Sequence, residues 1–444
     1  MKRNVIIIGA AGRDFHNFNT YFRNNANYNV VAFTATQIPD IADKKYPKEL
    51  AGELYPSGIP IYDQKELPRL IKELDVHECV FSYSDVHYVK MMNLASEINT
   101  LGATFTLLGL KDTMLKSTKP VIATGAVRTG GGKSEASRRI VDELHARGLK
   151  VIAIRHPMPY GDLVKQAVQR FATVEDLAKH ECTIEEMEEY EPHVVRNTVI
   201  YAGIDYEAIL RQAESENPDV ILWDGGNNDF PFIQPDLMIT MVDAQRAGHE
   251  VLYYPGETTL RMADVVVFNK IESGDLDDLL LVRKNVNKVN PNAKIIDAVS
   301  PTFIDNPEII RGKKVLVIEE GPTVTHGEVK YNYGALAALK YGAAELVDPK
   351  PYAVGKLKET FDSYPDLGPI LPSMGYSDQQ KADLEKTIAN TPCDLVLIAT
   401  PIDIKRIIKI DKPTVKIGYE LQEIGRPHFG DVIDEFVAKH NLKK

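Results

Sequence analysis

The chain has 444 residues, which is too long for one small domain and leads us to expect two or three folded units. With 52 Lys and Arg against 63 Asp and Glu, its formal net charge is −11, which argues against an extended nucleic-acid or anionic-membrane surface. A hydrophobic content of 44% with 26% charged residues is typical of a globular protein in water.

Cysteine spacing and the first apolar run bear on the cellular compartment. Cys79, Cys182 and Cys393 lie far apart and form no C-x-x-C pair, so we expect no disulfide framework and a reducing environment. Residues 5–8 form an apolar run that is too short for a signal peptide or a membrane helix. We therefore predict a cytoplasmic protein, and the spacing of its histidines predicts no structural zinc.

Short β-branched runs alternate with amphipathic segments along the whole chain. Near-continuous apolar strands separated by helices predict parallel sheets covered on both faces, and hence an α/β fold. The predicted strands lie at residues 5–8, 30–33, 121–123, 151–154, 220–223, 237–242, 265–268, 315–318 and 395–398.

Two strand–glycine-turn–helix openings, at residues 5 and 121, divide the chain. Between them, residues 109–114 form a glycine turn followed by polar residues, which is typical of a connection. We expect a Rossmann-like N-terminal domain over residues 1–115 and a larger P-loop NTPase domain with a mainly parallel sheet over residues 116–444. From about residue 328 we expect a C-terminal α/β extension, and the pattern leaves open whether it is a separate unit.

The first glycine turn, from Gly9 to Gly12, has the spacing G-x-x-G and not the G-x-G-x-x-G of a dinucleotide site. The second predicted strand also ends without an acid for a ribose, so a nicotinamide cofactor is disfavoured. Arg13 and His16 follow the turn near a helix N-terminus, where an anionic group could bind. A tight turn that only packs the first helix explains the same residues, and both interpretations remain open.

The strongest motif follows the strand at residues 121–123. Residues 125–134 read Gly-Ala-Val-Arg-Thr-Gly-Gly-Gly-Lys-Ser and precede a helical pattern, which is the context of a Walker A phosphate loop. Backbone N–H groups of such a loop surround phosphate oxygens, and the helix N-terminus adds its positive dipole. Nucleotide contacts are predicted for Gly130, Gly131, Gly132, Lys133 and Ser134.

The loop departs from the usual motif at its start. Val127 occupies the place of the usual first glycine, while Arg128 matches a variant loop that carries an extra basic residue able to reach a phosphate. Lys133 would bridge the β- and γ-phosphates, and the Ser134 hydroxyl would ligate Mg²⁺. A glycine turn that binds nothing is the alternative, which the Gly-Lys-Ser ending disfavours.

Basic residues also follow two other predicted strands. Arg155 and His156 come after residues 151–154, and His326 lies in the glycine turn of residues 321–327. Ligands of open α/β sheets bind outside the carboxyl ends of strands, so these side chains are candidate substrate contacts. For each histidine alone, a structural role is the commoner case.

The acid-rich segment of residues 185–191 is interpreted as a solvated helix face without specific chemistry. By contrast, Asp224 ends the apolar strand of residues 220–223, as in a Walker B segment, and could hold the hydration shell of Mg²⁺ beside Ser134. Asp229 is a lesser candidate for the same ion.

A possible nucleobase motif follows the strand at residues 265–268. Asn269, Lys270 and Glu272 resemble the Asn-Lys-x-Asp guanine motif of GTPases, with Glu one methylene longer than Asp. We predict that Asn269 and Lys270 contribute to the base site, and the longer acid leaves guanine specificity open. Polar capping of a strand end is the alternative.

Residues 9–18, 128–134 and 321–327 together resemble the cyclic 2,3-diphosphoglycerate synthetases and their relatives described as predicted GTPases. The three segments lie in the first, second and later parts of the chain, so the resemblance extends over essentially its whole length. The family activity is the ATP-dependent closure of 2,3-diphosphoglycerate into its cyclic pyrophosphate, with release of ADP and phosphate.

This resemblance implies ATP and Mg²⁺ as cofactors, 2,3-diphosphoglycerate as a small anionic substrate, and a homodimer. It implies that catalysis depends on Lys133, Arg128 and Asp224, with Ser134 and Asp224 at the metal. For the polyanionic substrate, the implied contacts are Arg13, His16, Arg155, His156 and His326.

Two other functional classes remain open. A regulatory P-loop GTPase or metallochaperone-like switch is supported by the motif at residues 269–272, and would hydrolyse GTP without a second substrate. A nucleotide-binding sensor without catalysis is disfavoured by the intact set of Lys133, Ser134 and Asp224.

Overall fold

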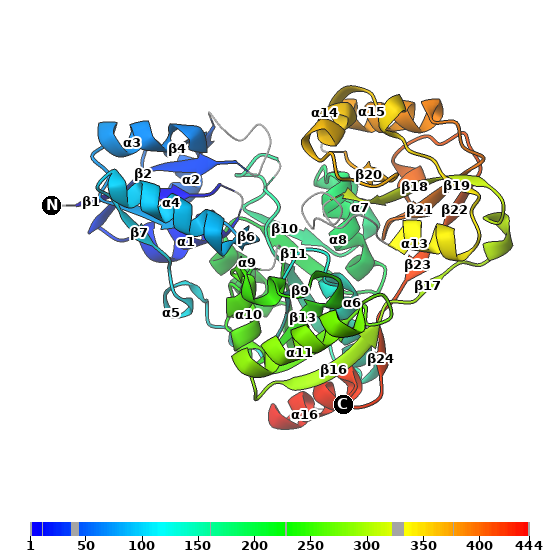
Figure 1. The fold of residues 1–444 in the computed structure, drawn as a ribbon. Helices are drawn as coiled ribbons and strands as arrows, with labels where there is room; N and C mark the ends of the chain where they lie inside the picture. Colours follow the sequence, from blue (N-terminus) through cyan, green and yellow to red (C-terminus); the bar gives the residue numbers. More distant parts are fainter. Residues whose placement is uncertain are drawn as a thin grey trace.

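The computed structural model describes residues 2–10, 12–36, 44–159, 161–226, 229–321, 333–375 and 377–442. Three α/β bodies, each built on its own large sheet, follow one another from the blue N-terminal end to the orange end (Figure 1). Each of the nine apolar runs that were predicted to be strands lies within a strand of the structure. The predicted α/β class with mainly parallel sheets is therefore confirmed.

The first sheet has the strand order β3-β4-β2-β1-β5-β7, and all neighbours except β3 and β4 pair in parallel. This order agrees with the Rossmann-like interpretation, which stays a prediction. The strands are β1 (Arg3–Ile8), β2 (Tyr28–Ala35), β3 (Lys45–Tyr46), β4 (Ile59–Asp63), β5 (Glu78–Phe81) and β7 (Thr104–Thr106). Its helices are α1 (Arg13–Asn17), α2 (Lys48–Ala51), α3 (Leu67–Glu73), α4 (Tyr88–Thr100) and α5 (Leu110–Thr113).

The central sheet has the order β10-β11-β9-β12-β8-β13-β15-β16-β24, with antiparallel pairs only at its two edges. The strands are β8 (Val121–Ala126), β9 (Val151–Arg155), β10 (Val168–Phe171), β11 (Val199–Gly203), β12 (Val220–Asp224), β13 (Leu237–Asp243), β15 (Val265–Asn269), β16 (Lys294–Val299) and β24 (Gln422–Ile424). Its helices are α6 (Lys133–Ala146), α7 (Val174–Lys179), α8 (Ile184–Val194), α9 (Tyr206–Ser215), α10 (Gly256–Met262), α11 (Leu276–Val289) and α16 (Phe429–Lys439).

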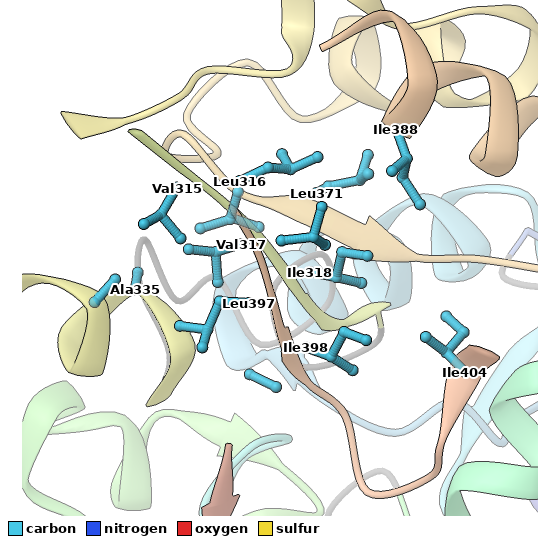
Figure 2. Close-up of a cluster of buried hydrophobic side chains, with 14 of the residues drawn as sticks. Val315, Leu316, Val317, Ile318, Ala335, Leu371, Ile388, Leu397, Ile398 and Ile404 are labelled. Atoms are coloured by element: carbon cyan, nitrogen blue, oxygen red, sulfur yellow. The ribbon is translucent and has the colours of Figure 1, made fainter. Parts of the chain in front are cut away.

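The third sheet is built around β18, with β19 and β20 on one side and β21 and β22 on the other. Its strands are β18 (Lys314–Glu320), β19 (Glu345–Leu346), β20 (Leu371–Ser373), β21 (Leu395–Ala399) and β22 (Thr414–Lys416), and its helices are α13 (Tyr333–Lys340), α14 (Gly355–Ser363) and α15 (Asp378–Asn390). Figure 2 shows its separate core, in which Val317 and Leu397 of adjacent strands lie beside Ala335 of α13. This sheet begins before residue 328, which lies outside the described residues.

Short ribbons join the three bodies. β6 (Val86–His87) of the first body pairs with β14 (Tyr253–Tyr254) of the second, and β17 (Thr302–Phe303) pairs with β23 (Gly418–Tyr419). After the third sheet the chain returns to the central one, where β24 and α16 end it (Figure 1). None of the described helices is long and apolar enough to cross a membrane.

Candidate functional site

The phosphate loop connects β8, at the middle of the central sheet, to α6. The chain moves from one side of β8 to the other between β12 and β13, and such a switch point opens a crevice at the carboxyl ends of the strands. Gly130 and Gly132 have φ values of 80° and 96°, which glycine adopts without steric cost. A Cβ at Gly132 would lie 2.0 Å from Asn269 Nδ2, so this glycine also permits a close approach.

Lys133, the first residue of α6, brings the two predicted magnesium ligands together. Its Nζ donates to Ser134 Oγ at 3.1 Å and to Asp224 Oδ1 at 3.2 Å. Burial lowers the pKa of Lys133, and the nearby Arg155 guanidinium lowers it further. The residues predicted from the Walker A and B motifs therefore meet at one point.

Asp224 is held by further donors at the end of β12. Ser137 Oγ donates to Oδ1 at 2.7 Å, Arg155 Nη1 lies 3.3 Å from Oδ1, and His193 Nε2 lies 3.1 Å from Oδ2. Burial alone would raise the pKa of Asp224, but the Lys133 and Arg155 cations hold it well below its usual range. Asp224 is therefore a carboxylate at neutral pH.

The acid-rich helix α8 is part of this site, and its interpretation as a solvated face is wrong. Ser134 Oγ donates to Glu189 Oε2 at 3.1 Å, and Arg155 Nη2 lies 2.6 Å from Glu189 Oε1. Glu186 and Glu188 are each only 2% exposed. The high number of acidic residues in this segment led to the interpretation as a solvated face. The spacing of three and four residues between Glu185, Glu188 and Glu189, however, places these side chains on one face of a helix.

The predicted base motif lies directly behind the phosphate loop. Asn269 Nδ2 donates to Gly131 O at 3.3 Å, and Lys270 Nζ donates to Gly130 O at 2.8 Å. Glu272 Oε1 accepts the Ser300 N–H at 3.1 Å. A neighbouring pocket is lined by Lys270, Glu272, Ser300, Tyr333 and other residues of this region. The contact of Asn269 and Lys270 with a base stays a prediction.

Arg128 lies at the junction with the first body. Its Nε is 2.6 Å from Asp85 Oδ1, its guanidinium carbon lies 3.7 Å from the centre of the Tyr253 ring, and it contacts His249. The Thr129 N–H also donates to Asp85 Oδ2 at 3.4 Å. Asp85 of the first body therefore holds the start of the phosphate loop, and the predicted contact of Arg128 with a phosphate remains untested.

Arg13 and His16 also lie where the first two bodies meet. Arg13 Nε donates to the two oxygens of Asp229 at 3.1 and 2.9 Å, while His156 Nε2 lies 3.3 Å from Asp229 Oδ2. The His16 ring stacks on Phe232 with ring centres 3.9 Å apart. Burial, with Arg13 nearby, lowers the pKa of His16 to about 3, so it is neutral at physiological pH. This geometry gives both residues a structural role at the junction.

One pocket collects the phosphate loop, α8 and the edge of the third body. Arg155 and His156 line it, as predicted substrate contacts would, whereas Arg13 and His16 are not among the described residues around it. His326 lies outside the described residues. The lining includes Arg128, Thr129, Gly130, Gly131, Gly132, Lys133, Ser134, Arg138, Arg155, His156, Glu185, Glu188, Glu189, Glu320, Tyr333 and Tyr419.

The Ser134 hydroxyl and the Asp224 carboxylate fit the predicted magnesium site by their chemistry. Both are oxygen donors of the kind Mg²⁺ takes beside phosphates, and both lie on the same Lys133 ammonium group. Among the described residues, no group of three or more His, Cys, Asp and Glu could hold a metal without further ligands. Oxygens of a bound nucleotide would have to supply the rest.

No protein-family model matches the chain. The chain is, however, 57% identical over 444 residues to the arginine synthetase ArcE of Thermococcus kodakarensis, which covers all of this chain and 99% of that protein. The chain belongs to the ArcE family. The similarity to this synthetase extends over the whole of the 444-residue chain.

The predicted relationship to cyclic 2,3-diphosphoglycerate synthetases is found at a greater distance. The synthetase of Pyrococcus furiosus is 23% identical over 195 residues, which is 37% of this chain and 45% of that protein. The motifs had led us to expect a resemblance over essentially the whole chain. The match in fact spans only part of it. A crystal structure of LpxK from Aquifex aeolicus in complex with ATP aligns with 84% of this chain and 99% of the LpxK chain, at 12% identity and with a TM-score of 0.44.

Proposed function

We propose that the protein forms arginine from citrulline and ammonium at the expense of ATP, with release of ADP and phosphate. Arginine differs from citrulline only in that nitrogen replaces the ureido oxygen, and this oxygen is a poor leaving group until it is phosphorylated. The observation that carries the proposal is the full-length relationship to an arginine synthetase in a chain that keeps Lys133, Ser134 and Asp224 together.

In the first step, the γ-phosphoryl group of ATP passes to the ureido oxygen of citrulline. The loop N–H groups and Lys133 would bind the β- and γ-phosphates, while Ser134 and Asp224 would hold Mg²⁺, which neutralises phosphate charge. Arg155 lies 3.3 Å from Asp224 and lines the same pocket, and its guanidinium would stabilise charge on the transferred group.

In the second step, ammonia attacks the carbon of the ureido group whose oxygen has been phosphorylated. A carbon–nitrogen bond forms, the carbon–oxygen bond breaks, and its electron pair leaves with inorganic phosphate. Binding both substrates in one pocket turns this attack into an effectively intramolecular reaction. The site must exclude water, since water attack would return citrulline.

Closure of 2,3-diphosphoglycerate is the second candidate function. It has the same first step, since a phosphoryl group again activates an oxygen that a neighbouring nucleophile then displaces. The partial similarity to the Pyrococcus furiosus synthetase favours it, and Arg155 and His156 could contact a polyanion. The carboxylates of Glu185 and Glu320 on the pocket wall disfavour it, because they would repel a substrate with two phosphates.

An omission assay tests the proposal. The purified protein is incubated with citrulline, ammonium, Mg²⁺ and ATP, and arginine and ADP are measured by chromatography. We expect equimolar arginine and ADP, and no arginine when any one component is left out. Lys133→Ala should reduce the rate by at least about a hundredfold, because it removes a phosphate contact made in the transition state.

Each negative result has a distinct meaning. Phosphate release that ignores citrulline and prefers GTP would replace the proposal by the P-loop switch. A cyclic pyrophosphate formed from 2,3-diphosphoglycerate and seen by phosphorus NMR, without any arginine from citrulline, would establish the second candidate. Full activity in Lys133→Ala would remove the phosphate loop from the mechanism.

A further inference from the structure

We propose that Glu188 binds the ammonium ion that supplies the new nitrogen, on the α8 wall of the pocket that the phosphate loop also lines. This inference rests on the proposed arginine-forming function and assigns one of its substrates to a subsite. Glu188 lies on α8 and lines the pocket together with Lys133 and Ser134.

Glu188 has an oxygen without a partner among the residues that the structure describes. The residue is 2% exposed; Oε1 accepts a hydrogen bond from Ser373 Oγ at 2.9 Å, while Oε2 is buried and has no hydrogen-bond partner in the described part of the chain. A buried carboxylate oxygen without a donor costs free energy, because folding removes its water without replacing it. A ligand that donates hydrogen bonds and carries positive charge would satisfy this oxygen.

The two adjacent glutamates of α8 differ in their surroundings. Glu189 is already neutralised, since Arg155 lies 2.6 Å from one of its oxygens and Ser134 donates to the other. Burial raises the pKa of Glu188 well above its usual value, and the nearby Glu320 carboxylate raises it further. Glu185 and Glu320 line the same part of the pocket. A cation bound at this wall would offset the burial and the repulsion, and so would favour the ionised form of Glu188.

Ammonium fits this wall better than a metal ion does. It is small and donates hydrogen bonds in all directions, so one carboxylate and neighbouring acceptors can hold it. A divalent metal needs several converging oxygen ligands, and no group of three such side chains in the described part of the chain could bind one. The α-ammonium group of citrulline carries the same charge, and the KM values for ammonium and for citrulline distinguish the two ligands.

The proton balance of the second step gives Glu188 a second task. Bound ammonium must lose a proton before nitrogen can attack, and the Glu188 carboxylate can accept it. Ammonia then forms the carbon–nitrogen bond, and phosphate leaves with the electron pair of the carbon–oxygen bond. The added nitrogen gives a second proton to this phosphate as the guanidinium forms, and Glu188 passes its own proton to the same phosphate. Arginine and dihydrogen phosphate leave, and the carboxylate is restored.

The matched variants are Glu188→Gln and Glu186→Gln. Glu186 lies on the same helix and is equally buried, but its carboxylate accepts from Thr183 and Gln166 and is not among the residues that line the pocket. In Glu188→Gln we expect the KM for ammonium to rise at least about tenfold, a loss of about 1.4 kcal/mol. The KM values for ATP and citrulline should not change, and Glu186→Gln should leave all three unchanged.

A rise in the KM for citrulline alone would assign Glu188 to the α-ammonium group and overturn the proposal. Unchanged values for all three substrates would overturn it as well. Shifted dependence on Mg²⁺ with an unchanged KM for ammonium would point to a metal ligand and equally contradict it.

A second measurement does not depend on turnover. Without nucleotide, NH₄Cl should raise the Tm of the unmodified protein more than KCl does at equal ionic strength, and Glu188→Gln should abolish the difference. If this holds while no arginine is formed, the proposed function fails and the ammonium site stands. An equal effect of the two salts, or a difference that persists in Glu188→Gln, would overturn the ammonium site even if arginine is formed.

Discussion

Asp224 and Glu189, two acidic residues beside the phosphate loop, each have more than one partner. Asp224 contacts Lys133, Arg155 and His193, while Glu189 contacts Arg155 and Ser134. The charges are therefore fixed before a nucleotide enters, which is how a site stabilises developing charge without reorganising in the reaction. The arrival of phosphates and Mg²⁺ must exchange some of these contacts, beginning with those of Lys133 and Ser134.

Glu186 should make stability depend on pH. Burial raises its pKa to about 7, against an ordinary 4.5, so the native state favours the protonated form. The contribution of Glu186 to the free energy of unfolding is fully present below pH 4.5 and is lost as the pH rises through about 7. The total loss is about 3 kcal/mol at most. Urea unfolding at pH 4.5 and pH 8 measures this loss.

In Glu186→Gln this dependence should weaken. Gln still caps the helix, because the capping box accepts Glu or Gln at this position. We expect the variant to gain stability relative to the unmodified protein at pH 8 and not at pH 4.5. An equal difference at the two pH values would show that Glu186 does not titrate in this range.

At the level of single elements, the two glycines that flank α6 have different surroundings. Gly132, before the helix, has Asn269 Nδ2 2.0 Å from the site of a Cβ, whereas Gly148, after it, has nothing within 4 Å. Both have positive φ values, of 96° and 71°. An added methyl group therefore strains the backbone at both positions and displaces a neighbour at only one.

Gly132→Ala should weaken ATP binding by at least about tenfold, because Asn269 can no longer hold the loop at Gly131. Gly148→Ala should cost about 1 kcal/mol of stability and leave ATP affinity unchanged. Titration calorimetry and thermal unfolding measure the two effects. Equal ATP affinity in both variants would show that the close approach of Asn269 does not shape the loop.

Much of the phosphate loop and its surroundings could be predicted from the sequence. The loop depends on glycines, a lysine and a serine at fixed spacing after a strand, and Asp224 depends on its place at the end of β12. The partners of these residues could not be predicted. Asp85 and Glu189 reach the loop only because β6 pairs with β14 and because α8 packs beside it, and no spacing along the chain encodes such contacts.

The role of α8 shows why net charge misled the sequence interpretation. A run of glutamates usually lies in water, yet Ser134, Arg155 and Ser373 each have a partner on this helix. The period of the helix contained the missing signal, since residues three and four apart share a face. For Arg13, the sequence left open an anion site or a packing turn, and the structure buries the side chain against Asp229, an internal counter-ion.

At the scale of the whole molecule, two ion pairs of different burial join the first and second bodies. Arg13 pairs with Asp229 at 2.9 Å with both side chains buried, whereas Arg23 pairs with Asp205 at 2.7 Å with each side chain about a fifth exposed. Removing one partner of a buried pair leaves an uncompensated charge, while a pair that water reaches is worth little. The two pairs therefore form a natural control for each other.

Arg13→Ala should destabilise the protein by about 3–5 kcal/mol, because among the described residues the Asp229 carboxylate would keep only the His156 side chain as a partner. Arg23→Ala should cost less than about 1 kcal/mol. Urea unfolding measures both. Equal losses would mean that burial of Asp229 does not control the junction. The predicted homodimer is a separate question, which sedimentation of the unmodified protein answers.

If ATP phosphorylates the ureido oxygen of citrulline, this oxygen must leave with inorganic phosphate, and an isotope label can follow it. Citrulline carrying ¹⁸O at the ureido position is incubated with ATP, Mg²⁺ and ammonium, and the products are analysed by mass spectrometry. The mechanism predicts that the label moves to inorganic phosphate while ADP stays unlabelled. Label recovered in AMP would show adenylyl transfer, and label recovered in water would show loss of the oxygen without phosphorylation; either result would contradict the mechanism.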